Sequence, residues 1–127
     1  ISKSIKSKLP MNKTFDLVNA INLVTPPHKR SKTLARVFQS IRIALNNELD
    51  KLNKFLNSFA DNLKIGGRIV IISYHSIEDR LVKHAYKKLH FQKKMRIITK
   101  KPIIPNSEEQ NLNQRSRSAK LRAAERI

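Results

Sequence analysis

The densest polar cluster in the sequence is the run Ser73-Tyr74-His75-Ser76-Ile77-Glu78-Asp79-Arg80. The run follows the carboxyl end of a predicted buried strand and leads into a predicted helix. In open α/β sheets ligands bind at this edge, so the position of the run makes it a candidate site. We predict that the catalytic residues lie in it, and the candidates are His75, Ser76, Glu78, Asp79 and Arg80.

Each candidate also has a purely structural interpretation. Ser76 and Asp79 have the Ser-x-x-Asp spacing of a variant capping box, whose only task would be to cap the helix. Glu78 would compensate the helix dipole in the first turn. His75 would be a packed loop histidine, and Arg80 would pair with a neighbouring carboxylate. The sequence leaves both interpretations open.

Several familiar chemistries do not fit these residues. Ser, His and Asp are all present, but neighbours at a strand end point in different directions and no nucleophile elbow is found. No pair of histidines has the i, i+4 spacing of a zinc site. The absence of cysteine excludes disulfides, thiolate metal sites and a cysteine nucleophile. We therefore predict no metal-binding residue and no complete active site within this sequence.

The charge of the chain predicts a polyanionic partner. Lys and Arg number 27 and Asp and Glu 9, a formal net charge of +18. RNA, DNA and an anionic membrane are the candidates, and a merely solvated basic surface is the alternative. The cations gather in two places, which predict phosphate contacts: Lys29, Arg30, Lys32 and Arg36, and then Arg115, Arg117, Lys120 and Arg122.

Nothing in the sequence predicts a membrane span or a signal peptide, and a cytoplasmic protein fits best. Because the sequence begins with Ile1 rather than Met, we expect it to be part of a longer polypeptide.

The first half of the chain predicts helices. Thr14 is typical of an N-cap, and the helix it begins must end before Pro26-Pro27. Residues 28–32 read as a basic loop. Apolar steps of three and four then predict two helices, about 33–46 and 48–63, with a break at Asn46-Asn47. Gly66-Gly67 would close the second helix as its C-cap.

The second half predicts part of an α/β doubly wound sheet. The β-branched run from Arg68 to Ser73 is typical of a strand buried on both faces, hence of a parallel sheet. A helix is predicted at about 77–90, with Ile77, Leu81, Ala85 and Leu89 on one face. Residues 95–99 are a second strand candidate, and 100–114 read as a long loop. Residues 118–127 fit a helix or a strand equally well.

Four blocks of this sequence, in order, resemble a known family. They are Phe38-Gln39-Ser40-Ile41-Arg42-Ile43-Ala44-Leu45-Asn46-Asn47-Glu48-Leu49, then Gly66 to Arg80, then Thr99-Lys100-Lys101-Pro102, then Arg115 to Arg126. They resemble F-Q-A-L-R-I-x-V-N-x-E-L, G-G-R-hydrophobic-S-F-H-S-L-E-D-R, T-x-K-P and R-A-R-S-A-K-L-R-A-A-E-R of the bacterial 16S rRNA cytosine-N4 methyltransferase family (RsmH, formerly MraW). Tyr74, Ile77 and Ser116 replace Phe, Leu and Ala, and residues 1–33 match only loosely.

The resemblance implies a class I, Rossmann-like methyltransferase fold with an inserted helical domain. Residues 1–46 would belong to the insert, and 47–127 would be the C-terminal part of the Rossmann-like domain. Residues 95–99 and 119–126 would form an antiparallel hairpin. The implied cofactor is S-adenosylmethionine, but the family's glycine-rich loop and acidic ribose ligand lie upstream of this sequence. No cofactor-binding residue is therefore assigned, and we expect this chain alone to be inactive.

The resemblance also implies a substrate, a cytidine in 16S rRNA of the small ribosomal subunit. Its N4 amine would attack the methyl group, and the protein would extract and align the base. We predict that the segment from His75 to Arg80 lines the base pocket. Arg42 and Asn46 are predicted to hold the insert against this pocket. Arg42 is also one of the predicted RNA-binding cations. The alternatives are a non-enzymatic RNA-binding or ribosome-associated module and a DNA-binding helical protein.

Overall fold

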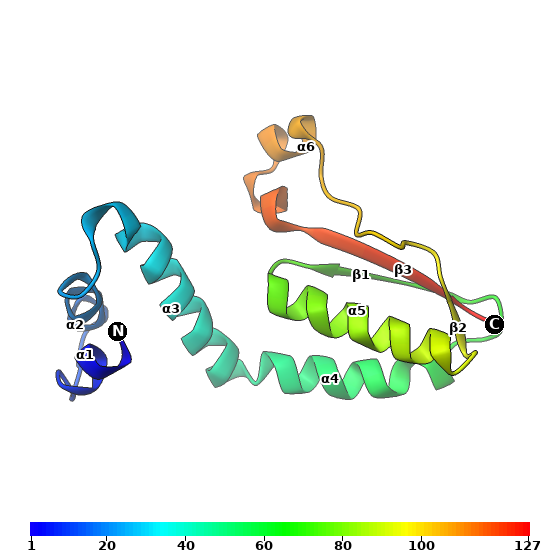
Figure 1. The fold of residues 1–127 in the computed structure, drawn as a ribbon, viewed down its shortest axis with the longest axis horizontal. Helices are drawn as coiled ribbons and strands as arrows, with labels where there is room; N and C mark the ends of the chain where they lie inside the picture. The colour runs from blue at the N-terminus through cyan, green and yellow to red at the C-terminus, as the bar shows by residue number, and fades with distance from the viewer. The chain divides into compact units, whose positions relative to one another are not determined.

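The computed structural model describes all 127 residues and divides into two compact units, Ile1–Glu48 and Leu49–Ile127. The first unit is helical, and the second combines helices with a small sheet (Figure 1). None of the helices is both long and apolar enough to cross a membrane.

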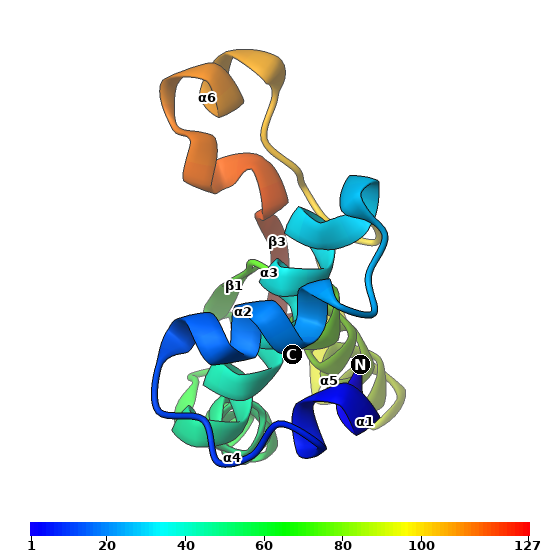
Figure 2. The ribbon, with the colours of Figure 1, turned by 90° about the vertical axis from the view of Figure 1, so that its left-hand side faces the viewer.

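The first unit contains three α-helices and one short 3₁₀ turn. These are α1 (Ser2–Lys6), α2 (Thr14–Asn22), η1 (Pro27–Lys29) and α3 (Arg30–Asn46). Helix α2 packs against both α1 and α3 (Figure 2). Its Ala20 and Ile21 are buried, and the Ser4 hydroxyl donates a hydrogen bond of 2.6 Å to the carbonyl of Ala20.

Two predictions for this unit were wrong. Lys13, not Thr14, is the N-cap residue of α2, and the carboxylate of Asp16 accepts hydrogen bonds from the backbone of Asn12 and Lys13 at 3.0 and 2.9 Å. Residues 28–32 are not a loop. Pro27 begins a 3₁₀ turn with its fixed φ, and that turn runs directly into α3 at Arg30.

The break between the two long helices is confirmed. Asn47 follows α3 and adopts a left-handed conformation with φ of 51°, which asparagine tolerates better than most residues. Helix α4 (Glu48–Ser58) begins directly after it and tightens into the 3₁₀ turn η2 (Phe59–Asn62).

The second unit contains a three-stranded sheet. After α4 and η2, the elements of this unit are β1 (Arg68–Ser73), α5 (Ser76–Phe91), β2 (Met95–Ile97), α6 (Ser107–Leu112), the 3₁₀ turn η3 (Gln114–Ser118) and β3 (Lys120–Arg126). The strand order is β1-β3-β2, and β3 is antiparallel to both neighbours. The predicted strand at 68–73 is confirmed at its bounds. The strand predicted at 95–99 is confirmed over Met95–Ile97, where it pairs antiparallel with the C-terminal segment as expected.

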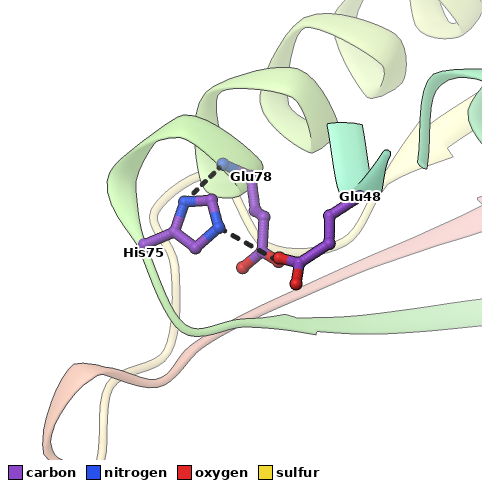
Figure 3. Close-up of side chains that lie close together, drawn as sticks. All are labelled: Glu48, His75 and Glu78. Carbon is purple, nitrogen blue, oxygen red and sulfur yellow. Dashed lines mark hydrogen bonds and ion pairs between the residues drawn. The ribbon is translucent and has the colours of Figure 1, made fainter. Parts of the chain in front are cut away.

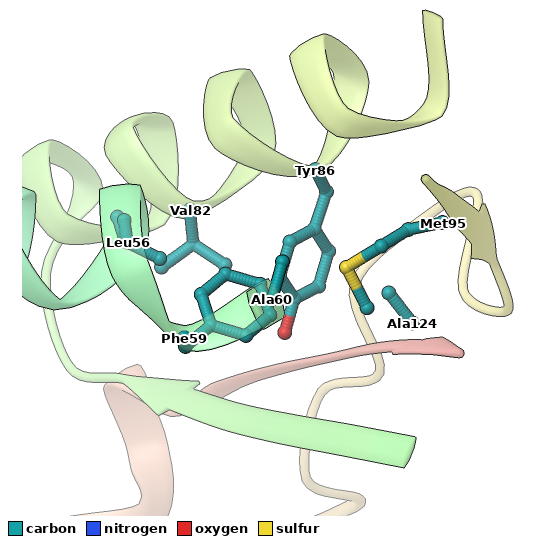
Figure 4. Packing of buried hydrophobic residues seen from close by; sticks show 7 residues of the cluster. All are labelled: Leu56, Phe59, Ala60, Val82, Tyr86, Met95 and Ala124. Atoms are coloured by element: carbon teal, nitrogen blue, oxygen red, sulfur yellow. The ribbon is translucent and has the colours of Figure 1, made fainter. Parts of the chain in front are cut away.

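The core of this unit lies on one face of the sheet. Side chains from α4, η2 and α5 pack together with residues of β2 and β3 (Figure 4). The cluster consists of Leu56, Phe59, Ala60, Val82, Tyr86, Met95 and Ala124. On β1 the inward residues Ile69 and Ile71 pack against it, while Val70 and Ile72 on the other face are 57% and 51% exposed.

The prediction of a parallel sheet buried on both faces was therefore wrong for this chain. Strand β1 pairs along one edge only, with the antiparallel β3, and the helices cover one face only. An unbroken β-branched run does not reveal how many of its faces the same chain covers.

Three smaller predictions also differ. Gly66 and Gly67 do not cap a helix: Gly66 has φ of 79° in a turn, and its N–H donates to the carbonyl of Arg126 at 2.9 Å. The predicted loop 100–114 contains α6, whose N-cap Asn106 accepts from the N–H of Glu109 at 2.8 Å. On α5 the buried residues are Val82 and Tyr86; Leu81, Ala85 and Leu89 are partly buried, but Ile77 is exposed.

Candidate active site

The segment from Ser73 to Glu78 turns the chain from the carboxyl end of β1 into α5. Ser73 is buried at the end of the strand, and His75 is the N-cap of the helix. The Nδ1 atom of His75 accepts a hydrogen bond of 3.3 Å from the backbone N–H of Glu78. The predicted Ser76–Asp79 capping box was wrong, because His75 fills the N-cap role one residue earlier.

The side chains of His75 and Glu78 lie side by side at this strand end (Figure 3). A neutral imidazole that accepts through Nδ1 carries its proton on Nε2. That atom faces Oε1 of Glu78 at 3.2 Å, while Oε2 accepts from the N–H of Tyr74 at 3.0 Å. The His75 side chain is 9% exposed and the Glu78 side chain 25%, so the carboxylate is oriented and still reachable by a ligand.

Asp79 belongs to a different arrangement. Its Oδ1 and Oδ2 accept hydrogen bonds from Nε and Nη2 of Arg122, on β3, at 2.6 and 3.2 Å. The Nζ atom of Lys120 lies 3.8 Å from Oδ2. The hydrogen bond from Arg122 is the main cause that lowers the pKa of Asp79. Arg122 is buried, so the pair ties the first turn of α5 to β3. The pairing therefore has a structural role, and the catalytic role of Asp79 and the RNA-binding role of Arg122 stay predictions.

The structure does not bring Ser76 and Arg80 into the same cluster. Both residues are exposed, and neither side chain has a hydrogen bond or an ion pair. Of the five predicted catalytic residues, only His75 and Glu78 therefore have side chains paired with each other.

The predicted RNA-binding cations of the first unit divide into engaged and solvent-facing residues. Arg30 donates to the carbonyl of Thr25 at 3.3 Å and to that of Asn22, the last residue of α2, at 3.4 Å. Arg42 pairs with Glu48 at 3.0 Å. The exposed remainder consists of Lys29 at the end of η1 and of Lys32 and Arg36 in the first half of α3.

Asn46 donates to the same carboxylate as Arg42, Oε1 of Glu48, at 3.1 Å. The two family-motif residues thus organise the junction after α3. Their role in holding an inserted domain stays a prediction.

In the second cluster Arg115 and Arg117 are exposed on η3, whereas Lys120 is partly buried beside Asp79. Only the first two of these side chains are fully available to an RNA backbone.

Comparison with known proteins decides the relationship. The family model described as the MraW methylase family matches residues 1–127. The chain belongs to the MraW methylase family. Proteins named ribosomal RNA small subunit methyltransferase H from Thermosipho africanus and Thermotoga neapolitana are 50% and 47% identical over the whole chain. One from Synechocystis is 45% identical, also over the whole chain. The chain spans 44%, 43% and 42% of these three relatives, so it corresponds to less than half of their length.

The sequence of this MraW-family chain did not reveal two further groups of residues. One is the Asp79–Arg122 pair, whose members lie 43 positions apart and carry no local signal. The other is a hollow beside the C-terminal half of α5, lined among others by Lys83, Tyr86 and Lys87. The i, i+4 spacing of the two lysines was the available signal for a cationic helix face.

Proposed function

We propose that this chain is part of an enzyme that methylates the N4 amine of a cytidine in 16S rRNA, with S-adenosylmethionine as methyl donor. Membership of the family supports this function, and so do the names of the relatives, which state methylation of small-subunit ribosomal RNA. The observation that carries the role of this chain is the His75–Glu78 pair at the carboxyl end of β1.

Glu78 would act as the hydrogen-bond acceptor for the cytosine amine. An exocyclic amine offers two N–H donors, and a carboxylate that accepts from one of them fixes where the nitrogen lone pair points. His75 would be a positioning residue, because it receives the N–H of Glu78 and faces its carboxylate. Alignment of this kind requires no covalent nucleophile, which agrees with a chain that has no cysteine.

The two glycines of this chain do not form a donor-binding loop. The turn at Gly66 and Gly67 precedes β1, whereas a phosphate- or nucleotide-binding loop follows a strand and opens a helix. A Cβ at Gly67 would lie 2.7 Å from the carbonyl oxygen of Lys64, so this glycine is required by its own turn. We therefore place the donor site in the part of the enzyme outside this chain, and we derive no step through the donor.

The two compact units would then correspond to part of an inserted helical domain and to the C-terminal part of a Rossmann-like domain. The solvent-facing cations Lys29, Lys32, Arg36, Arg115 and Arg117 would contact the phosphates of the RNA. Each such contact would contribute about 0.7 to the slope of log affinity against log salt for a single strand.

The test joins this chain to the upstream part of the Thermosipho africanus relative. Calorimetry should show S-adenosylmethionine binding to the joined protein and none to this chain alone. Mass spectrometry of 16S rRNA from small subunits incubated with the joined protein should show N4-methylcytidine. A joined protein that binds the donor and the RNA but forms no methylcytidine would favour a non-enzymatic RNA-binding module instead.

A further inference from the structure

A hollow of about 450 Å³ lies between the C-terminal half of α5 and strands β2 and β3. We call it the α5–β2 pocket. Tyr86 and Ile97 contribute apolar surface, and Lys83, Lys87, Arg96 and Lys100 contribute cationic groups. Its size is in the range of pockets that hold small organic ligands. It is formed by residues of the second unit alone, and none of the residues that form the His75–Glu78 pair lines it.

The cations of the pocket are only partly neutralised. No acidic side chain lines it. The nearest carboxylates are engaged elsewhere: Asp79 holds Arg122, and Glu125 holds both Arg68 and Arg96 at 2.8 Å. Lys87 and Lys100 have no carboxylate within ion-pair distance, so the pocket presents uncompensated positive charge on an apolar wall.

Tyr86 adds an independent observation. Its side chain points from α5 towards the sheet, is 2% exposed, and ends in a hydroxyl without a hydrogen-bond partner in the protein (Figure 4). Buried tyrosine hydroxyls normally have a partner. Burial raises the pKa of Tyr86, so the hydroxyl keeps its proton and can both donate and accept.

We propose that the α5–β2 pocket binds one nucleotide unit of a single-stranded RNA. The ammonium groups of Lys87 and Lys100 bind its phosphate, and Ile97 with the aliphatic stems of the lysines covers the ribose and base. On binding, the side chains that cover the buried Tyr86 hydroxyl move aside, and the hydroxyl bonds to a polar atom of the same nucleotide. The combination of an apolar wall and a cationic rim suits a nucleotide better than inorganic phosphate, because inorganic phosphate has no apolar surface to pack against the wall. This inference goes beyond the proposed function and rests on it for the choice of RNA as the source of the nucleotide.

The experiment titrates the full chain with a single-stranded hexaribonucleotide, with cytidine 5′-monophosphate and with inorganic phosphate. The variants are Tyr86→Phe and Lys87→Ala, and Lys54→Ala is the control, an exposed lysine on α4 outside the pocket. We expect Tyr86→Phe and Lys87→Ala each to weaken hexanucleotide binding by about 5- to 10-fold, since a lost hydrogen bond or phosphate contact has this order of effect. The control should change affinity by less than 2-fold.

Thermal unfolding without RNA separates a ligand role of Tyr86 from a structural one. Because the hydroxyl has no partner in the protein, Tyr86→Phe should unfold at the same temperature as the wild type or higher. A lower unfolding temperature would mean that the hydroxyl stabilises the fold, and Lys87→Ala, at an exposed site, then still tests the pocket.

Wild-type affinity for the hexanucleotide in both variants would overturn the proposal, as would the same loss in the Lys54→Ala control. Equal affinity for cytidine monophosphate and the hexanucleotide, with the same sensitivity to the variants, would overturn the proposal that the bound nucleotide belongs to an RNA strand. The pocket would then be a site for a free nucleotide. Failure of the joined enzyme to methylate, with RNA binding still dependent on Tyr86 and Lys87, would overturn the proposed function and leave the pocket standing.

Discussion

Helix α5 carries charged residues at both ends, and the two ends use them differently. At the amino-terminal end Glu78 and Asp79 are engaged, the first by His75 and the backbone, the second by Arg122. Towards the carboxyl-terminal end Lys87 has no anionic partner and faces a hollow. Polar groups that satisfy one another can hold a fixed geometry, whereas unsatisfied groups are left for a ligand. The first end is thus suited to aligning a neutral base, and the second to binding an anion.

The largest expected effect at the amino-terminal end comes from Asp79→Asn. Removing the carboxylate leaves the buried guanidinium of Arg122 without its partner, which should lower the free energy of unfolding by about 3 kcal/mol. Urea denaturation measures this change. The double variant Asp79→Asn/Arg122→Met should recover much of the loss, because the uncompensated charge is gone. A double variant as unstable as the single one would contradict the pairing.

The same pair should make stability depend on acid. Since the folded-state pKa of Asp79 is lowered, its contribution is present above the unfolded value near 4 and is lost as the pH falls through the folded pKa. The free energy of unfolding of the wild type should therefore decline below about pH 4 more steeply than that of Asp79→Asn. If the free energies of unfolding of the two proteins declined in parallel with pH, the pKa of Asp79 would not be lowered in the folded state.

A smaller effect is expected from Glu78→Ala. The substitution removes the acceptor of the Tyr74 N–H and should cost about 1 kcal/mol of stability, similar to the loss of a helix cap. Chemical denaturation provides the measurement. A loss as large as that of Asp79→Asn would mean that the two neighbouring carboxylates have the same structural role, and the contrast between them would fail.

The smallest effect is expected from Glu125→Gln on β3. The carboxylate binds Arg68 and Arg96, and the hydrogen bond from Arg68 is the main cause that lowers its pKa, but both arginine side chains are exposed. Exposed pairs contribute little and are screened by salt. The unfolding midpoints of variant and wild type should converge as the salt concentration rises, and a gap that persists in high salt would contradict this.

Much of the local structure could be predicted from the sequence because it depends on local signals. The β-branched run from Arg68 to Ser73 marked β1 at its correct bounds, and the Asn46-Asn47 pair marked the break between α3 and α4. The strand at 120–126 needed the resemblance, since its propensity is that of a helix as much as a strand.

The remaining features depend on contacts between distant residues. The antiparallel partner of β1 lies about 50 positions downstream, and the apolar pattern of Ile69 to Ile72 says nothing about its direction. Within the candidate site the sequence predicted one group that contains His75, Glu78 and Asp79, whereas the structure pairs only the first two with each other. The separation of Glu78 from Asp79 is produced by Arg122, which reaches Asp79 across the packing of α5 on β3.

The most direct test of the account measures methyl transfer by the joined enzyme with Glu78→Gln. The amide keeps the size of the side chain but replaces one acceptor oxygen with an N–H₂ donor, which repels the cytosine amine. We predict that turnover on 16S rRNA falls about 100-fold or more while RNA affinity and donor affinity stay within 2-fold. The matched control is Glu108→Gln, the same change at an exposed position on α6 outside the candidate site. Undiminished turnover in Glu78→Gln would contradict the account, because the pair at the end of β1 would then take no part in aligning the base.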